Sequence, residues 1–228
     1  MHGEAVAFPQ LLVPGQPHLR VSMLAAWADQ LMGLLAVQIM APRVPTTLEL
    51  HVHLYRPAPG SGVIRGRARL QKAGRSVLAA VVEFVSDAGE TFAEGAGSFM
   101  LAGDPHVRLP STISLDLPPR LATLTEPIAE RARCERRAPG HAVLPLRDDA
   151  LNSSNTLNGG LLAVAAEEAL LSLAPHTSLS SLGLRYLRPV RTGPAVARAR
   201  LQSGLGHVEL FDGGQDSRLA VTATARVF

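Results

Sequence analysis

The sequence predicts an α+β fold in which a long apolar helix followed by antiparallel strands occurs twice. Residues 67–71 read RARLQ, and the same five residues recur without change at 198–202. An Arg-Pro step precedes each copy at almost the same distance, and an apolar segment lies upstream of each step. Because several elements recur in the same order, the chain is predicted to contain two copies of one unit.

The first copy, residues 1–103, begins with a predicted helix at 19–40 that is apolar apart from Asp29 and a few amides. Four strands are predicted after it. The segments between them (PGSG, KAGR and SDAG) contain the glycines that are typical of hairpin turns. The strands are expected at 47–57, 63–74, 76–86 and 90–101.

The second copy, residues 125–228, follows a Pro-rich linker predicted at 104–124. A short helix is expected to start at Thr125 as N-cap with Pro127 in its first turn. A strand at 141–146 precedes the second apolar helix, 157–174, whose Glu167 aligns with Asp29. The remaining strands are predicted at 181–189, 195–204, 207–214 and 217–228.

Composition bounds the class of protein. The chain has 228 residues, of which 46% are hydrophobic and 18% charged, as in an ordinary globular protein. No apolar run or leader suggests a membrane span or a signal peptide, and a single cysteine, Cys134, fits a reducing cytoplasm. The net charge of +3 comes from dispersed arginines, so we expect no nucleic-acid partner.

Three carboxylates in the apolar helices require an explanation: Asp29, Glu167 and Glu168. A buried carboxylate costs several kcal/mol unless it is paired, solvated or protonated. Three structural explanations compete with catalysis: capping of a local bend, a position at the solvent edge of the helix, or an ion pair with an arginine of the other half. The matched positions of Asp29 and Glu167 favour a shared functional site.

The segment before the second helix reads LNSSNTLNGG and supplies complementary chemistry. Gly159 and Gly160 permit close approach of a ligand, and their N–H groups lie at the positive end of the helix dipole. Such donors can stabilise a carbonyl oxygen as it becomes negative. The side chains of Asn152 and Asn158 add further hydrogen-bonding groups.

These motifs resemble the hotdog-fold acyl-CoA thioesterases of the phenylacetate-pathway type. That family has an Asn, a His-Gly-Gly six residues later and an acid nine residues after the His, a spacing matched by Asn152, Asn158-Gly159-Gly160 and Glu167. The resemblance covers nearly the whole chain as a double hotdog, with each central helix wrapped by a curved sheet. The family His is Asn158 here, and in the first half Pro14, Arg20 and Val21 replace the Asn, His and first Gly.

The resemblance implies a composite site that takes its Asn-Gly-Gly loop from one half and its acid from the other. Here Asn152, Asn158, Gly159 and Gly160 would therefore work with Asp29, and Thr47 matches a family position that often holds a hydroxyl. Asp29 would act as base or nucleophile in thioester hydrolysis. The second site, with Glu167 held by Arg20, is expected to be inactive.

We expect acyl-CoA or an acyl-carrier thioester as substrate. No metal and no cofactor are expected beyond the coenzyme A of the substrate, and CoA phosphates would bind Arg56, Lys72 and Arg75. A non-catalytic acyl-CoA or fatty-acyl binding protein is the alternative, and a hydratase is the third possibility. A homodimer of double hotdogs is possible, and the acyl chain is not specified.

Overall fold

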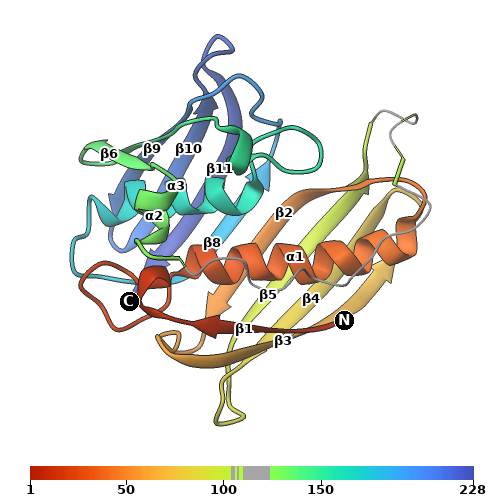
Figure 1. Cartoon of the computed structure of the whole chain (residues 1–228), viewed down its shortest axis with the longest axis horizontal. Helices are drawn as coiled ribbons and strands as arrows, with labels where there is room; N and C mark the ends of the chain where they lie inside the picture. Colours follow the sequence, from red (N-terminus) through yellow and green to blue (C-terminus); the bar gives the residue numbers. More distant parts are fainter. Residues whose placement is uncertain (104–105, 107, 110–123) are drawn as a thin grey trace.

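The computed structural model describes residues 1–103, 106, 108–109 and 124–228. In this part of the chain eleven strands form one antiparallel sheet, and the two long helices lie on the same face of it (Figure 1). The strand order is β1-β3-β4-β5-β2-β8-β11-β10-β9-β7-β6. The two halves of the chain therefore meet where β2 pairs with β8, in the middle of the sheet.

The first half contains one helix and five strands. The helix α1 confirms the helix predicted in the first apolar segment, and four strands follow it as expected. The bounds are β1 His2–Ala7, α1 Val21–Met40, β2 Pro45–Leu54, β3 Gly62–Ala73, β4 Val77–Val85 and β5 Thr91–Leu101, with a short 3-10 turn at Pro9–Leu11.

The second half has the same order of elements, preceded by one short helix and one extra strand. Its long helix, α3, is again followed by four strands. The bounds are α2 Ile128–Arg131, β6 Glu135–Ala138, β7 His141–Leu144, α3 Gly159–Leu171, β8 Leu179–Tyr186, β9 Ala195–Gln202, β10 Leu205–Asp212 and β11 Arg218–Val227, with a 3-10 turn at Asp148–Ala150.

The two halves agree in detail as well as in order. β1 pairs with β3 as β7 pairs with β9. The central strands β2 and β8 each carry one extra residue against their neighbours, Leu48 and Ser180. These residues stand eight positions before the arginines of the two Arg-Pro steps, Arg56 and Arg188. Positions in β2 and β8 can therefore be compared residue by residue.

The core lies between the sheet and the two helices. Inward-facing strand residues such as Leu50, Val82 and Leu184 are buried, in the alternating pattern of a sheet with one face covered. Nearly every residue of α3 is buried, whereas α1 keeps an exposed side. By length and composition α1 could cross a membrane, a test that a core helix also passes, and in this fold it packs against β2 and β3.

Two sequence predictions need correction, and a third concerns residues that the structure does not describe. Thr125 does not cap a helix: α2 begins after Pro127, no side chain caps it, and it ends at Arg131. A four-residue helix leaves Glu135–Ala138 to pair with β7 as strand β6, which the sequence prediction missed together with β1. The predicted linker, 104–124, lies almost wholly outside the described residues.

Candidate functional site

Each long helix begins against the side of the other, so the molecule has two comparable helix N-termini. At the start of α1, the carboxylate of Glu167 from α3 accepts hydrogen bonds from the Val21 N–H (3.1 Å) and the Ser22 hydroxyl (2.5 Å). Glu167 is fully buried, and burial raises its pKa above the ordinary value. An acid of the second half therefore occupies the Val21 N–H, the backbone donor that corresponds to the Gly159 N–H at the start of α3.

Arg20 completes this closed arrangement. Its guanidinium contacts Glu167 at 3.5 Å and Glu168 at 2.6 Å, and it donates to the Leu12 carbonyl oxygen. Arg136 adds a second ion pair to Glu168, also at 2.6 Å. The structure thus pairs the acids of α3 with an arginine of the other half, one of the explanations open from sequence. We call Arg20, Ser22, Glu167 and Glu168 the plugged site.

A cavity of about 450 Å³ lies beside the plugged site. The loop around Pro14, the short helix α2 and the Arg20–Glu168–Arg136 ion pairs line it. Cys134 also lines it, but burial raises the pKa of this thiol to about 12, which leaves it a poor nucleophile. Neither Asp29 nor Gly159 reaches this cavity, so it is separate from the site expected to carry the chemistry.

The N-terminus of α3 is open by comparison. Asn158 is its N-cap, and its side-chain oxygen accepts the Gly160 N–H at 2.8 Å. That bond removes Gly160 from the donors that the sequence suggested for a ligand. The Gly159 N–H has no hydrogen-bond acceptor among the described residues. One backbone donor at the positive end of the helix therefore remains available.

Close packing brings this open N-terminus against α1. A methyl group at Gly160 would lie 2.8 Å from the Ala26 Cβ atom, so only glycine permits this approach of the two helices. Asp29 follows Ala26 by three residues and lies on the same side of α1. The structure thus brings the side of α1 that carries Asp29 toward the Gly-Gly start of α3, and the joint role of these residues stays a prediction.

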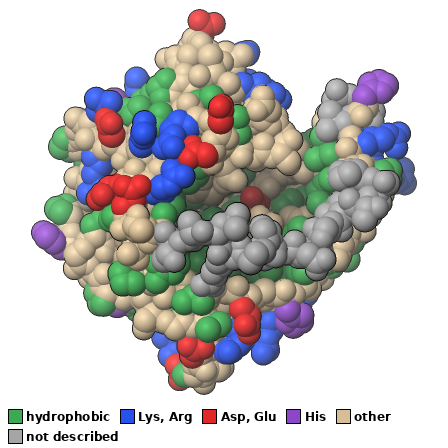
Figure 2. Space-filling view, in the orientation of Figure 1, with side chains coloured by type: hydrophobic (Ala, Val, Ile, Leu, Met, Phe, Trp, Pro, Cys, Tyr) green, Lys and Arg blue, Asp and Glu red, His purple; other side chains and the backbone are tan. Residues whose placement is uncertain are grey.

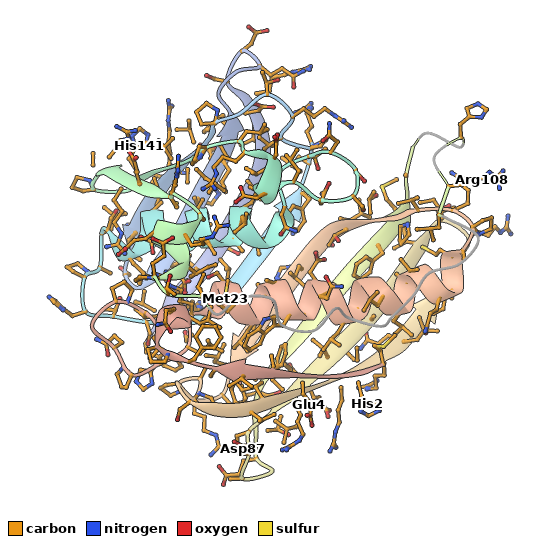
Figure 3. All side chains as sticks on the ribbon, viewed as in Figure 1. His2, Glu4, Met23, Asp87, Arg108 and His141 are labelled. Carbon is orange, nitrogen blue, oxygen red and sulfur yellow. The ribbon has the colours of Figure 1, made fainter. Side chains whose placement is uncertain are left out.

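Asp29 is held by Thr47, whose hydroxyl donates to it at 2.7 Å. The surrounding protein raises the pKa of Asp29 above its ordinary value, and the Thr47 hydrogen bond partly opposes this rise. Figure 2 shows a hollow between the two halves with an acidic side chain at its floor. In Figure 3, Met23 in the first turn of α1 marks where the halves meet.

Asn152 is placed differently from the expected role of orienting a water or carbonyl. Its side-chain oxygen accepts bonds from the Ser154 N–H and from the N–H and hydroxyl of Thr156. These bonds fold the loop that leads to Asn158, so its oxygen is committed to shaping the loop. Only its NH₂ group is left for a ligand.

Comparison with known proteins identifies the fold. Residues 21–93 match the family model of the thioesterase superfamily. An acyl-ACP thioesterase from Bacteroides thetaiotaomicron has a TM-score of 0.72 at 10% identity, covering 100% of this chain and 97% of that one. The 12:0-ACP thioesterase from Umbellularia californica gives 0.69 at 12% identity, covering 100% and 96%.

A protein described as having a hot dog fold, from Alicyclobacillus acidocaldarius, gives a TM-score of 0.57 at 18% identity and covers 100% of this chain and 91% of that one. The chain has a hotdog fold. No match was found among curated proteins. At these identities the structural comparisons establish the fold of the chain alone.

Of the three basic residues expected to bind CoA phosphates, Arg56 lies apart from Lys72 and Arg75. Arg56 pairs with Glu90 (2.6 Å) in the β4–β5 turn, at the end of the sheet marked by Asp87 in Figure 3. Lys72 and Arg75 lie at the β3–β4 hairpin, separated from that end by the length of β3, about 35 Å. Arg56 therefore cannot join them at one phosphate group.

Sequence reasoning missed one further group near the N-terminus of α3. Tyr186, at the end of β8, donates its hydroxyl to the Gly159 carbonyl oxygen at 3.3 Å. A single tyrosine in a strand has no sequence signature, and its position depends on the pairing of β8 with β2. Among the described residues, no group of three or more His, Cys, Asp and Glu side chains is arranged to hold a metal ion.

Proposed function

We propose that this chain hydrolyses acyl thioesters at a single composite site formed by Asp29 and Thr47 of the first half and the Gly159 N–H of the second. The observation that carries the proposal is the difference between the two helix N-termini. One N–H end is occupied by Glu167, whereas the other keeps a free donor beside an acid.

The two halves are proposed to be tandem hotdog repeats, residues 1–103 and 125–228. The matched order of elements and the matched extra residues in β2 and β8 support this interpretation. The Asn, Gly-Gly and acid spacing supports a phenylacetate-type ancestor. The chain then holds both halves of a composite site in one polypeptide.

The chemistry follows from the groups at the open site. The Gly159 N–H and the α3 dipole polarise the thioester carbonyl and stabilise the negative oxygen that forms on attack. Asp29 takes a proton from water as the C–O bond forms. Collapse of the intermediate breaks the C–S bond, and the proton passes from Asp29 to the departing thiolate. The raised pKa of Asp29 makes it a stronger base than an ordinary carboxylate.

The thiol carrier is coenzyme A or an acyl carrier protein. Lys72 and Arg75 support CoA, because they are exposed at the end of the sheet where β2 begins and Thr47 lies. Replacing both by Ala should raise the KM for acyl-CoA several-fold at low salt and have less effect at high salt. Arg56→Ala is the matched control, and an equal rise there would contradict the assignment.

The alternative is a non-catalytic acyl-CoA binding protein. Asn158 in place of the family His favours it, since this side chain is committed to capping α3. A homodimer and a cytoplasmic location remain predictions.

The test is thiol release from short, long and aryl acyl-CoAs, comparing wild type with Asp29→Asn and Glu167→Gln. We expect turnover that Asp29→Asn abolishes and Glu167→Gln retains. Loss of turnover in Glu167→Gln but not in Asp29→Asn would mean that Glu167 of the second half is the working acid. Acyl-CoA binding without turnover on any substrate would establish the binding protein instead.

A further inference from the structure

The Tyr186 side chain lies directly over the first residue of α3. A Cβ atom added at Gly159 would be 3.2 Å from the Tyr186 hydroxyl oxygen and 3.3–3.4 Å from two ring carbons. The hydroxyl donates to the Gly159 carbonyl oxygen at 3.3 Å, a long hydrogen bond. The phenol therefore contacts the residue whose N–H is the free donor of the proposed site.

Tyr186 also lies close to the acid of that site. Burial, together with the negative charge of Asp29, raises the pKa of Tyr186 well above its ordinary value, so the phenol stays protonated. β8 runs beside β2, and in their register Arg185 lies opposite Glu49. Tyr186 follows Arg185 in β8, and Glu49 stands two residues after Thr47 in β2. The residues around Asp29 thus come from α1, β2 and β8, and Tyr186 connects them to the N-terminus of α3.

The plugged site shows that these hydroxyls are not required by the fold. Counting back from the Arg-Pro steps, Tyr186 corresponds to Leu54 and Thr47 corresponds to Leu179. Leu179 is buried, and Leu54 packs against the core. Both hydroxyl positions of the open site are therefore leucines in the other half. Among the described residues, the Thr47 and Tyr186 hydroxyls thus have no counterpart at the start of α1, where the Ser22 hydroxyl contacts the acid instead.

We propose that Tyr186 is a catalytic residue whose hydroxyl oxygen holds the attacking water against Asp29. The inference rests on the proposed thioester hydrolysis. The Tyr186 hydroxyl donates its proton to the Gly159 carbonyl oxygen, so its own oxygen keeps lone pairs that can accept a hydrogen bond from one O–H of the water. The other O–H is directed to Asp29, which takes that proton as the water oxygen bonds to the carbonyl carbon.

The experiment compares Tyr186→Phe with Tyr55→Phe, which alters the only other tyrosine of the chain, an exposed one. We expect Tyr186→Phe to lower kcat about tenfold or more, as loss of one hydrogen bond to the reacting water predicts, with little change in KM. Tyr55→Phe should retain the wild-type kcat. An unchanged kcat in Tyr186→Phe, or a change in KM alone, would overturn the assignment.

A second measurement keeps the test independent of folding defects. Because the chain has only two tyrosines, Tyr186 is the one tyrosine left in the Tyr55→Phe background, and it can be replaced there by fluorotyrosines that keep the ring and the hydroxyl. Fluorine weakens the phenol oxygen as an acceptor, so kcat should fall as fluorines are added. A rise in kcat would mean that the hydroxyl acts as a donor to substrate, which contradicts the proposal.

The outcomes separate this inference from the function on which it rests. A wild-type protein that hydrolyses no thioester would remove the proposed function itself. A wild-type protein that is active and abolished by Asp29→Asn, with Tyr186→Phe fully active, would leave thioester hydrolysis standing and remove only the role of Tyr186.

Discussion

Gly160→Ala tests whether close contact of the two helices creates the open site. The added Cβ would lie 2.8 Å from the Ala26 Cβ, about 0.6 Å inside the 3.4 Å at which ordinary contact begins. Such overpacking typically costs about 1–3 kcal/mol, offset by up to about 1 kcal/mol from the helix propensity of alanine. We expect a net loss of about 1 kcal/mol and a fall in Tm of about 2–4 °C.

Activity should fall more than stability. Moving the start of α3 away from α1 displaces the Gly159 N–H from Asp29, and a misplacement near 1 Å can cost about a hundredfold in rate. We therefore expect at least a tenfold loss of thioesterase activity. The assays are thermal unfolding and thiol release, both measured on the same purified variant.

Gly33→Ala is the matched control in α1. There a Cβ would meet only the Phe99 ring, at 3.8 Å, so the variant should be stabilised slightly and remain active. Ala26→Gly in the Gly160→Ala background removes the opposing methyl and should recover activity. If Gly160→Ala matched Gly33→Ala in both assays, the reasoning about the helix contact would be refuted.

Three further predictions concern protonation. Thr47→Val removes the hydrogen bond that lowers the pKa of Asp29, so the acidic limb of the kcat/KM profile should move to higher pH; movement to lower pH would contradict the role of this bond. The pKa of Glu167 is raised from 4.5, so its contribution to stability is present below about pH 4.5 and is lost as pH rises through the folded pKa. Urea unfolding should therefore show that wild type loses stability relative to Glu167→Gln as the pH rises through that window. A difference in unfolding free energy that does not change with pH would contradict the raised pKa of Glu167. Cys134, with its pKa raised to about 12, should react with iodoacetamide only after unfolding, as mass spectrometry can establish.

Much of the fold could be predicted because its signals are local. The apolar helices, the glycine-containing turns and the RARLQ repeat are properties of neighbouring residues, and the structure has the helices and strands they indicate. The short strands β1 and β6 lack such signals, since they are strands only because an edge of the sheet is available for pairing. Pro127 also shows that the first favourable capping residue, Thr125, need not begin the helix.

The site was predictable only in part for a related reason. The family resemblance implied that Asp29 works with the Gly-Gly loop of the other half, and in the structure Ala26 of α1 packs against Gly160 of that loop. The commitment of the Asn152 oxygen to its own loop, and of Arg56 to Glu90, depends on which partner lies nearest in three dimensions. Such choices between a ligand and a neighbouring side chain are decided by tertiary contacts that no spacing in the sequence encodes.

The difference between the plugged and the open helix N-terminus bears on how such a molecule can change. In a dimer of identical subunits every substitution appears twice, so an arginine placed at one helix start would close both sites. With both halves in one chain, Arg20 and Asn158 can differ independently. One helix start can then be fixed by buried ion pairs while the other keeps its free N–H. An active-site titration should therefore count one site for each 24.1 kDa chain.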